Sequence, residues 1–269
     1  MKNHFIIATI LLIWTLSAKA QTANSYIAHQ VSFKSADGQI TFGGTLTLPG
    51  GVNNVPAVII VSGRGKQDRD GKIAGHPLFA QIADYLSNNG IAVLRLDDRG
   101  VGKTTGDLQL ATARNLADDA LTATQFLKSV NGISKNKIGL MGHGEGGTVI
   151  SLAAAGSKDV AFLISLAGVA LSDADGAKTL ARLRVPILAL HGDKDLEVAA
   201  EQNLDNWKKY TAFGGNRKVR TVLLSGLNHL FLPCKTCTIA EYPFIKADFS
   251  LRTLNVINLW LQANIVKFN

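Results

Sequence analysis

The sequence predicts an α/β fold with a mostly parallel sheet covered by helices on both faces. Two observations predict it. Short runs rich in Val, Ile and Leu alternate with segments of helical character along most of the chain. Several of these runs are apolar without interruption, as in "PAVIIVS", which is typical of strands buried on both faces.

The first 20 residues predict a secretory signal peptide. Lys2 precedes an apolar run over 5–16, and Ala18-Lys19-Ala20 gives the small residues expected before a cleavage site. The apolar run is shorter than the roughly 20 residues that span a bilayer, so we expect no stable membrane anchor after cleavage. We therefore expect cleavage after Ala20, a single domain over 21–269, and a periplasmic or secreted protein.

A hairpin is expected to open the domain. Residues alternate in polarity over 27–47 around the turn Ala36-Asp37-Gly38, as two strands with one wet face would. This pair predicts an antiparallel edge for the sheet. Six later strands should bring the total to about eight, and they are expected over 56–62, 91–97, 137–143, 161–168, 186–192 and 219–226. Helices are expected over 77–89, 113–130, 146–155, 177–183, 198–210 and 250–266.

Charge does not point to a nucleic-acid partner. The net charge of +8 counts Lys2 and Lys19, and the other cations are scattered along the chain. Cys234 and Cys237 form Cys-Lys-Thr-Cys in a loop, for which a short disulfide or two idle thiols are the expected states. Two cysteines are too few for a structural zinc site, so we expect no metal.

Candidate site residues follow the expected strands, because ligands of open α/β sheets sit at the carboxyl ends of the strands. "KIGLM" leads into "GHGEGG", whose small residues allow the sharp strand-to-helix turn of a nucleophile elbow. Gly144 stands where the nucleophile belongs.

An acid and a base follow later strands, in the chain order of a hydrolytic triad built on such a sheet. Asp195 follows "PILALHG" and His229 follows "VRTVLLSG". We expect Asp195 to orient the His229 imidazole as a general base, with Asp193 as the competing acid. The N–H groups of Arg64 and Glu145 are the candidate oxyanion-hole donors.

Five stretches together resemble the α/β-hydrolase superfamily, and within it the secreted bacterial carboxylesterases related to serine aminopeptidases and dienelactone hydrolases. These stretches are "SGRGKQDRDG", "GIAVLRLDDRGVGKTTGD", "IGLMGHGEGG", "PILALHGDKDLEV" and "GLNHLFLPC". The resemblance implies hydrolysis of carboxylic esters without a cofactor.

Three departures from that family stand out. Gly144 replaces the serine of Gly-His-Ser-Glu-Gly, and Arg64 and Lys66 replace serine and proline of a Gly-Ser-Gly-Pro turn. The segment 169–185 is too short for the family's helical cap. Glycine cannot form an acyl-enzyme. Two hypotheses stay open: a weak ester hydrolase that uses His229 and water, or an inactive relative that binds a small acidic or carboxylate ligand.

Overall fold

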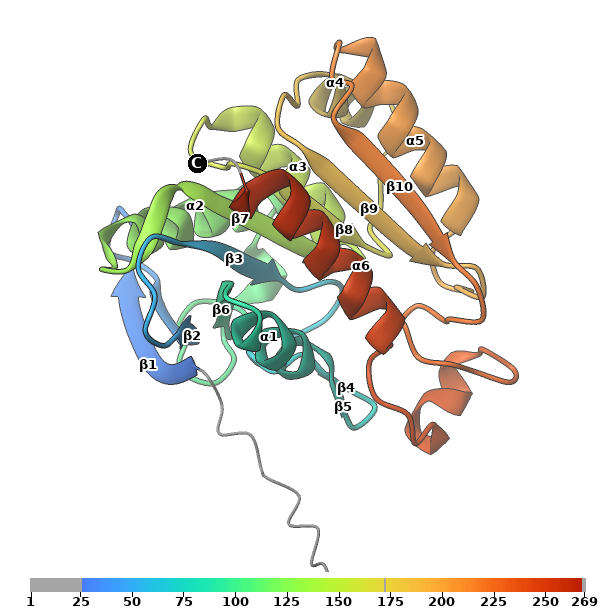
Figure 1. The fold of residues 1–269 in the computed structure, drawn as a ribbon, viewed down its shortest axis with the longest axis horizontal. Helices are drawn as coiled ribbons and strands as arrows, with labels where there is room; N and C mark the ends of the chain where they lie inside the picture. The colour runs from blue at the N-terminus through green and yellow to red at the C-terminus, as the bar shows by residue number, and fades with distance from the viewer. Residues whose placement is uncertain (1–25, 172, 268–269) are drawn as a thin grey trace, which may run out of the picture.

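A computed structural model describes residues 26–171 and 173–267, and its centre is an eight-stranded sheet (Figure 1). The strands lie in the order β1-β2-β6-β3-β7-β8-β9-β10. The predicted fold class is confirmed. The strands are β1 (Tyr26–Lys34), β2 (Thr41–Pro49), β3 (Val55–Val61), β6 (Ala92–Leu96), β7 (Ile133–His143), β8 (Leu163–Leu166), β9 (Ile187–Gly192) and β10 (Val219–Leu224).

The hairpin forms the antiparallel edge of this sheet. β1 pairs with β2 along its whole length, and β2 pairs antiparallel with β6. From β6 to β10 every neighbouring pair is parallel. The carboxyl ends of these parallel strands therefore share one edge, where the loops after β3, β7, β9 and β10 meet.

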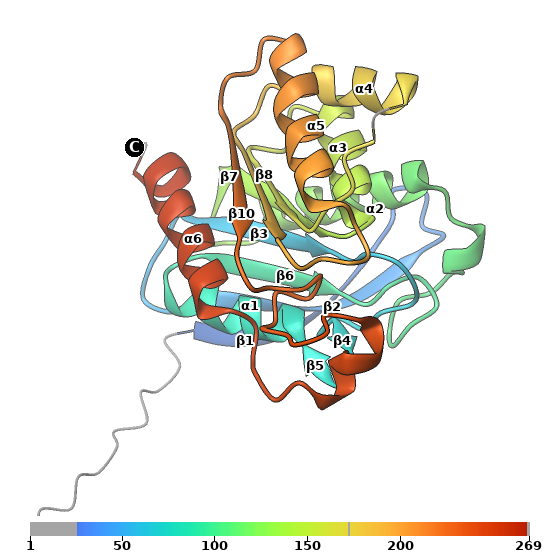
Figure 2. The same cartoon turned by 90° about the vertical axis from the view of Figure 1, so that its right-hand side faces the viewer.

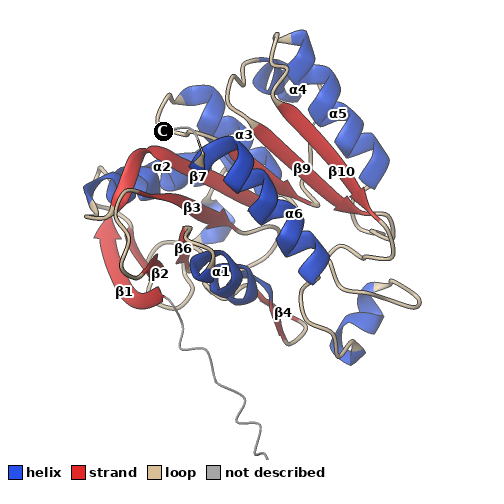
Figure 3. Cartoon of the chain, viewed as in Figure 1, coloured by secondary structure: helices blue, strands red, loops and turns tan. Residues whose placement is uncertain are grey.

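Helices cover both faces of the sheet, as Figures 1 and 2 show. Apolar residues of α1 and α6 pack on one face, and those of α2, α3, α4 and α5 pack on the other. Figure 3 shows the resulting alternation of strands and helices. The helices are α1 (Leu78–Asn88), α2 (Ala113–Ser129), α3 (Gly146–Gly156), α4 (Ala174–Ala181), α5 (Ala200–Phe213) and α6 (Leu251–Leu261).

Strand residues alternate between the two layers because side chains of a strand point to opposite faces. In β3, Val58 and Ile60 join the layer of α1 and α6, whereas Ala57 and Ile59 join the layer of α2 and α3. Each of the four is at most 5% exposed. This double burial explains the continuous apolar runs in the sequence.

Two helices begin away from their predicted positions for local reasons. α4 begins at Ala174, earlier than expected, because the Asp173 carboxylate accepts the N–H of Gly176 and caps the helix. α5 begins at Ala200, later than expected, because the N–H groups of Glu197 and Val198 are bonded to Asp195 instead.

Short elements complete the chain. They are the small pair β4 (Lys72–Ile73) and β5 (His76–Pro77), the 3₁₀ helices η1 (Leu108–Leu110) and η2 (Ile239–Phe244), and a π-helical turn η3 (Gln262–Val266). Among the described residues between β8 and β9, which omit 172, α4 is the single helix. Over 26–171 and 173–267, no helix has the length and apolar character needed to cross a membrane. The predicted signal peptide lies outside these residues.

Candidate active site

The turn between β7 and α3 has the backbone of a nucleophile elbow. Gly144 has φ +54°, in the left-handed region that favours glycine. A Cβ at Gly142 would clash with the carbonyl oxygen of Gly146, and a Cβ at Gly146 would lie 2.6 Å from that of Ser62. The flanking glycines are therefore required by the close approach of strand and helix.

Gly144 faces the imidazole of His229. A Cβ built at Gly144 would lie 3.3 Å from His229 Nε2, so a serine at this position would place its hydroxyl against that nitrogen. Glycine provides no such oxygen. The site thus keeps the approach of elbow and base without the nucleophile.

His229 and Asp195 form a hydrogen-bonded pair. His229 Nδ1 lies 2.8 Å from Asp195 Oδ2, and the Asp195 side chain is fully buried. Burial alone would raise the pKa of Asp195, but hydrogen bonds from His229 and from the N–H groups of Val198 and Glu197 lower it below its ordinary value. An ionised Asp195 holds His229 with Nε2 toward Gly144.

The competing acid, Asp193, lies elsewhere. Its carboxylate accepts the N–H of Gly226 at 2.6 Å and lies near Lys194. Asp193 thus tethers the loop after β10 to the loop after β9. The structure pairs Asp195, and not Asp193, with His229.

The two candidate oxyanion donors meet at the elbow. Within the described residues, the N–H groups of Arg64 and Glu145 have no hydrogen-bond partner. Gly63 brings the two segments together, because a Cβ at this glycine would lie 3.6 Å from the Glu145 nitrogen. Both N–H groups therefore stay free to bind an anionic oxygen.

The side chains of the same two residues pair with each other. Arg64 Nε donates to Glu145 Oε1 at 3.0 Å, and the two side chains are 88% and 53% exposed. Such an exposed pair contributes at most about 1 kcal/mol. Lys66 Nζ lies 3.6 Å from Asp107 Oδ1. The added cations of this turn are therefore each paired with a carboxylate.

Two buried histidines beside the pair were not predicted as site residues. His143 Nε2 lies 3.1 Å from the carbonyl oxygen of His229, and His191 Nε2 lies 3.7 Å from Asp195 Oδ2. Burial lowers the pKa of His143 to about 3 and that of His191 to about 4. Both are neutral at pH 7. Their positions at the ends of β7 and β9 are the sequence signal that could have found them.

A disulfide-bonded segment packs beside the acid loop. Cys234 and Cys237 are joined in a disulfide, and Glu241 accepts the N–H groups of the turn between them. Tyr242 donates its hydroxyl to Glu197 Oε1 at 2.7 Å, two residues after Asp195. Over 26–171 and 173–267, no three His, Cys, Asp or Glu side chains are arranged to hold a metal ion.

Strand order, elbow and acid–base pair define the class of fold: the chain has the α/β-hydrolase fold, and its sequence resembles the α/β-hydrolase superfamily. The family model of serine aminopeptidase S33 matches residues 58–176. Among curated proteins, Esterase EstD of Thermotoga maritima is 25% identical, over 81% of this chain and 65% of the esterase. The chain thus spans less than two thirds of that relative's length, and it resembles carboxylic ester hydrolases.

Solved structures share the fold at low identity. The α/β hydrolase GrgF from a Penicillium species is 18% identical, with a TM-score of 0.67 over 89% of this chain and 99% of that one. A putative dienelactone hydrolase from Klebsiella pneumoniae is 14% identical, with a TM-score of 0.68 over 91% of this chain and 100% of that one. Est1E from Butyrivibrio proteoclasticus, with ferulic acid bound, is 18% identical, with a TM-score of 0.67 over 88% of this chain and 100% of that one.

Proposed function

We propose that the chain is a slow carboxylic ester hydrolase in which His229 activates a water molecule in place of the missing serine. One observation carries the proposal: His229 keeps its bond to Asp195 and directs Nε2 at the position of the absent side chain, 3.3 Å from a Cβ at Gly144. The resemblance to esterases supports the substrate class.

The reaction follows from this arrangement. Water attacks the acyl carbon as its proton passes to His229 Nε2, and the carbonyl oxygen becomes an anion that the N–H groups of Arg64 and Glu145 bind. The intermediate then expels the alkoxide, which takes the proton from His229, and the carboxylic acid remains. Loss of a triad nucleophile costs roughly 10⁶ in turnover, whereas the remaining groups retain roughly 10³ to 10⁴ over water.

Hydrolysis of p-nitrophenyl butyrate tests the proposal. We expect a slow steady rate without a burst in the unmodified protein, and its loss in His229→Ala. We expect Gly144→Ser to raise the rate at least about 100-fold, because it restores the nucleophile next to an intact base. His29→Ala, on an exposed stretch of β1, is the matched control and should keep the parent rate. Equal rates in the parent and His229→Ala would contradict the proposal.

The alternative function is that of an inactive protein that binds an acidic ligand. The cations Arg64 and Lys66 in the turn after β3 are the observation that would favour it. Arg64 pairs with Glu145, and Lys66 pairs with Asp107, so little free positive charge faces such a ligand. This binding role stays a prediction. Calorimetric titration with short carboxylic acids tests it, and binding tighter than that of the corresponding neutral ester would favour it over hydrolysis.

We also propose that the protein works outside the cytoplasm as a single domain over 21–269. The disulfide between Cys234 and Cys237 supports an oxidising compartment. Mass spectrometry of the protein purified from its host tests the proposal, since a mature chain that begins at Gln21 is expected.

A further inference from the structure

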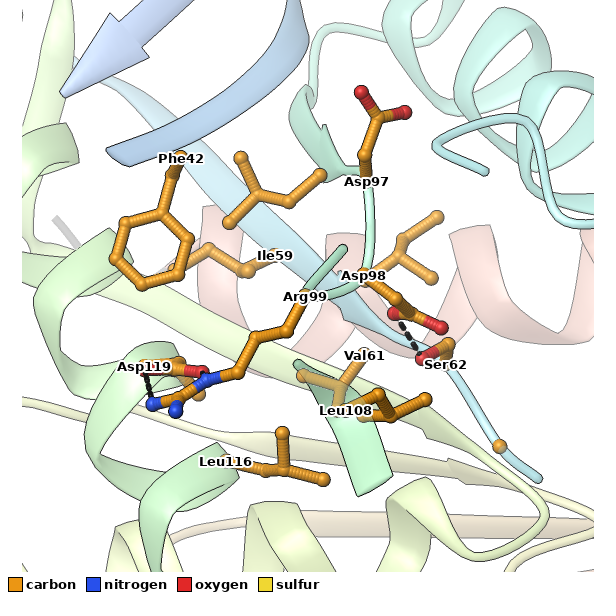
Figure 4. A pocket seen from close by; sticks show the side chains of 14 residues that line it. Phe42, Ile59, Val61, Ser62, Asp97, Asp98, Arg99, Leu108, Leu116 and Asp119 are labelled. Carbon is orange, nitrogen blue, oxygen red and sulfur yellow. Dashed lines mark hydrogen bonds and ion pairs between the residues drawn. The ribbon is translucent and has the colours of Figure 1, made fainter. Parts of the chain in front are cut away.

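Two pockets lie beside the elbow and have no assigned role. The first, which we name the β3–β6 pocket, lies at the ends of β3 and β6 and reaches the start of α2 (Figure 4). Its apolar part is formed by Phe42, Ile59, Val61, Leu108 and Leu116. The second, the α3–α4 pocket, lies between these two helices and combines apolar lining residues, among them Leu152, Val169, Leu171 and Leu180, with the polar Thr148, Ser151, Asp173, Asp175 and Thr179.

Each pocket has one lining residue that adjoins Gly144, whereas Gly144 and His229 themselves line neither pocket. Gly63 lines the β3–β6 pocket, and its Cα lies 3.9 Å from the position of a Cβ at Gly144. Val169 lines the α3–α4 pocket and donates its N–H to the carbonyl oxygen of Gly144 at 2.9 Å. In the sheet, β7 leads to the elbow and lies between β3 and β8. The pockets therefore flank the elbow on opposite sides.

The β3–β6 pocket has a polar wall, in which the carboxyl group of Asp98 accepts hydrogen bonds but has no cationic partner in the described part of the chain. Arg99 donates two hydrogen bonds of 2.7 Å to Asp119, which neutralises both side chains. Asp98 accepts from the Ser62 hydroxyl at 2.6 Å and from the Gln67 N–H at 2.8 Å, as Figure 4 shows for Ser62. Within the described residues Asp98 forms no ion pair.

Asp98 is charged in weakly basic solution. Burial raises its pKa to about 6, so the carboxyl group is ionised at pH 8. A carboxylate brought beside it in a partly enclosed space would be repelled, whereas a hydrogen-bond donor would find a strong acceptor. Among its described lining residues, the opposite pocket has no comparable buried charge, because Asp173 caps α4 and both Asp173 and Asp175 are exposed.

We propose that the two pockets hold the two arms of an ester, and that Asp98 selects an arm that ends in a hydrogen-bond donor. The arm in the α3–α4 pocket is apolar, and the arm in the β3–β6 pocket ends in a hydroxyl or ammonium group and never in a carboxylate. This assignment rests on the proposed function for the position of the ester bond, which lies at Gly144 between the pockets. It adds a specificity-determining residue, Asp98.

Binding of matched esters at pH 8 tests the assignment. The probes are ethyl esters of five-carbon acyl chains that end in methyl, ammonium or carboxylate, and acetates whose alkoxy chains carry the same three ends. Dissociation constants come from NMR titration of the unmodified protein. In the series whose variable arm enters the β3–β6 pocket, we expect the ammonium ester to bind tightest and the carboxylate ester at least about ten-fold weaker than the methyl ester.

Variants locate the effect. Asp98→Asn should remove the discrimination between ammonium and carboxylate ends, and Asp175→Asn, at the rim of the other pocket, should leave it unchanged. Leu116→Trp should weaken the binding of esters with a long arm in the β3–β6 pocket. Leu152→Trp should weaken the binding of esters with a long arm in the α3–α4 pocket. Each lost methylene contact should lower the affinity about four-fold. Leu259→Trp, on an exposed position of α6, is the matched control.

Folding is checked by circular dichroism, and Leu116→Ala and Leu152→Ala replace any tryptophan variant that unfolds; they should favour bulkier arms. Equal binding of methyl and carboxylate ends by the parent, or unchanged discrimination in Asp98→Asn, would overturn the assignment. These results are independent of turnover: slow hydrolysis dependent on His229, combined with no discrimination, would reject the pockets and keep the proposed function. Discrimination without hydrolysis would reject the proposed function and keep the pockets as a binding site.

Discussion

Gly144 combines a positive φ with a position opposite His229 Nε2. Glycine adopts this backbone without strain, whereas other residues pay about 1 to 3 kcal/mol in the left-handed region. We therefore expect Gly144→Ala and Gly144→Ser to lower the free energy of unfolding by similar amounts in this range. Chemical denaturation at pH 7.5 measures both variants. Only the serine variant should gain esterase activity, which separates the backbone effect from the chemistry.

The buried histidines make stability depend on pH. The pKa values of His143 and His191 fall to about 3 and 4 in the folded protein, below the unfolded value of about 6.5. Their contribution to the free energy of unfolding is complete above pH 6.5. It is lost as pH falls toward 4, because the unfolded chain then binds protons that the folded protein does not. Between pH 7.5 and 5.0 each histidine should cost up to about 2 kcal/mol of stability.

His191→Gln tests this pH dependence, because glutamine does not titrate. The loss of unfolding free energy between pH 7.5 and 5.0 should shrink by up to about 2 kcal/mol relative to the parent. Asp98 acts in the opposite direction, since its raised pKa favours the protonated folded state at low pH. It contributes equally to parent and variant and cancels in the comparison. An identical pH dependence of the two proteins would show that His191 is not buried in neutral form.

Site residues that follow a motif could be predicted from sequence, and those that depend on side-chain direction could not. Asp195 and His229 follow strands in a recognisable order, and the structure bonds them to each other. The sequence does not predict the pairing of the Arg64 and Glu145 side chains, because only their N–H groups follow from the elbow motif. Sequence order fixes which loops meet, but rotamers and local hydrogen bonds decide which side chains touch.

At the scale of elements, the segment between β10 and α6 takes part in supporting the acid loop. Tyr242 in η2 donates its hydroxyl to Glu197, and its carbonyl oxygen lies 2.9 Å from His76 Nε2 of β5. The disulfide closes a short turn just before η2. The sequence indicated the pair of cysteines but not these contacts, because the segment lacks the periodicity of a helix or strand.

Removal of the disulfide should loosen this segment. A cross-link over such a short loop stabilises by about 2 kcal/mol in the loop-entropy description. The double variant Cys234→Ser with Cys237→Ser should therefore unfold about 2 kcal/mol more easily, with faster hydrogen exchange over 232–249. Tyr242→Phe keeps the disulfide and should speed exchange only near Glu197. Unchanged exchange in the double variant would show that Glu241 alone holds the turn.

Helix positions illustrate what propensity and pattern can resolve. α2 begins where expected, since Thr112 and Asn115 form a capping box that the sequence displays. α5 begins after its predicted start because Asp195 takes the N–H groups of Glu197 and Val198. The Asp195 carboxylate thus overrides local helical preference, and such a competition between tertiary and local bonds cannot be read from the pattern alone.

At the scale of the whole molecule, Arg69 connects the antiparallel edge to the site. It lies in the loop after β3 that also carries Arg64, and its Nε donates to Asp97 Oδ1 at 2.9 Å, just after β6. Its Nη1 donates to the carbonyl oxygen of Gly44 at 2.7 Å and to Gln30 Oε1 at 2.6 Å. One guanidinium therefore joins β1, β2, the end of β6 and the oxyanion loop.

Loss of Asp97 should disrupt this connection and leave a charge without a partner. The side chains of Arg69 and Asp97 are only 15% and 3% exposed, and removing one member of a buried pair typically costs 3 to 5 kcal/mol. We expect Asp97→Ala to lose about this much unfolding free energy in urea at pH 7.5. Asp175→Ala, which breaks an exposed pair with Lys178, should lose less than about 1 kcal/mol. Similar losses in the two variants would mean that the edge of the sheet is held by strand pairing alone, and that the oxyanion loop does not depend on it.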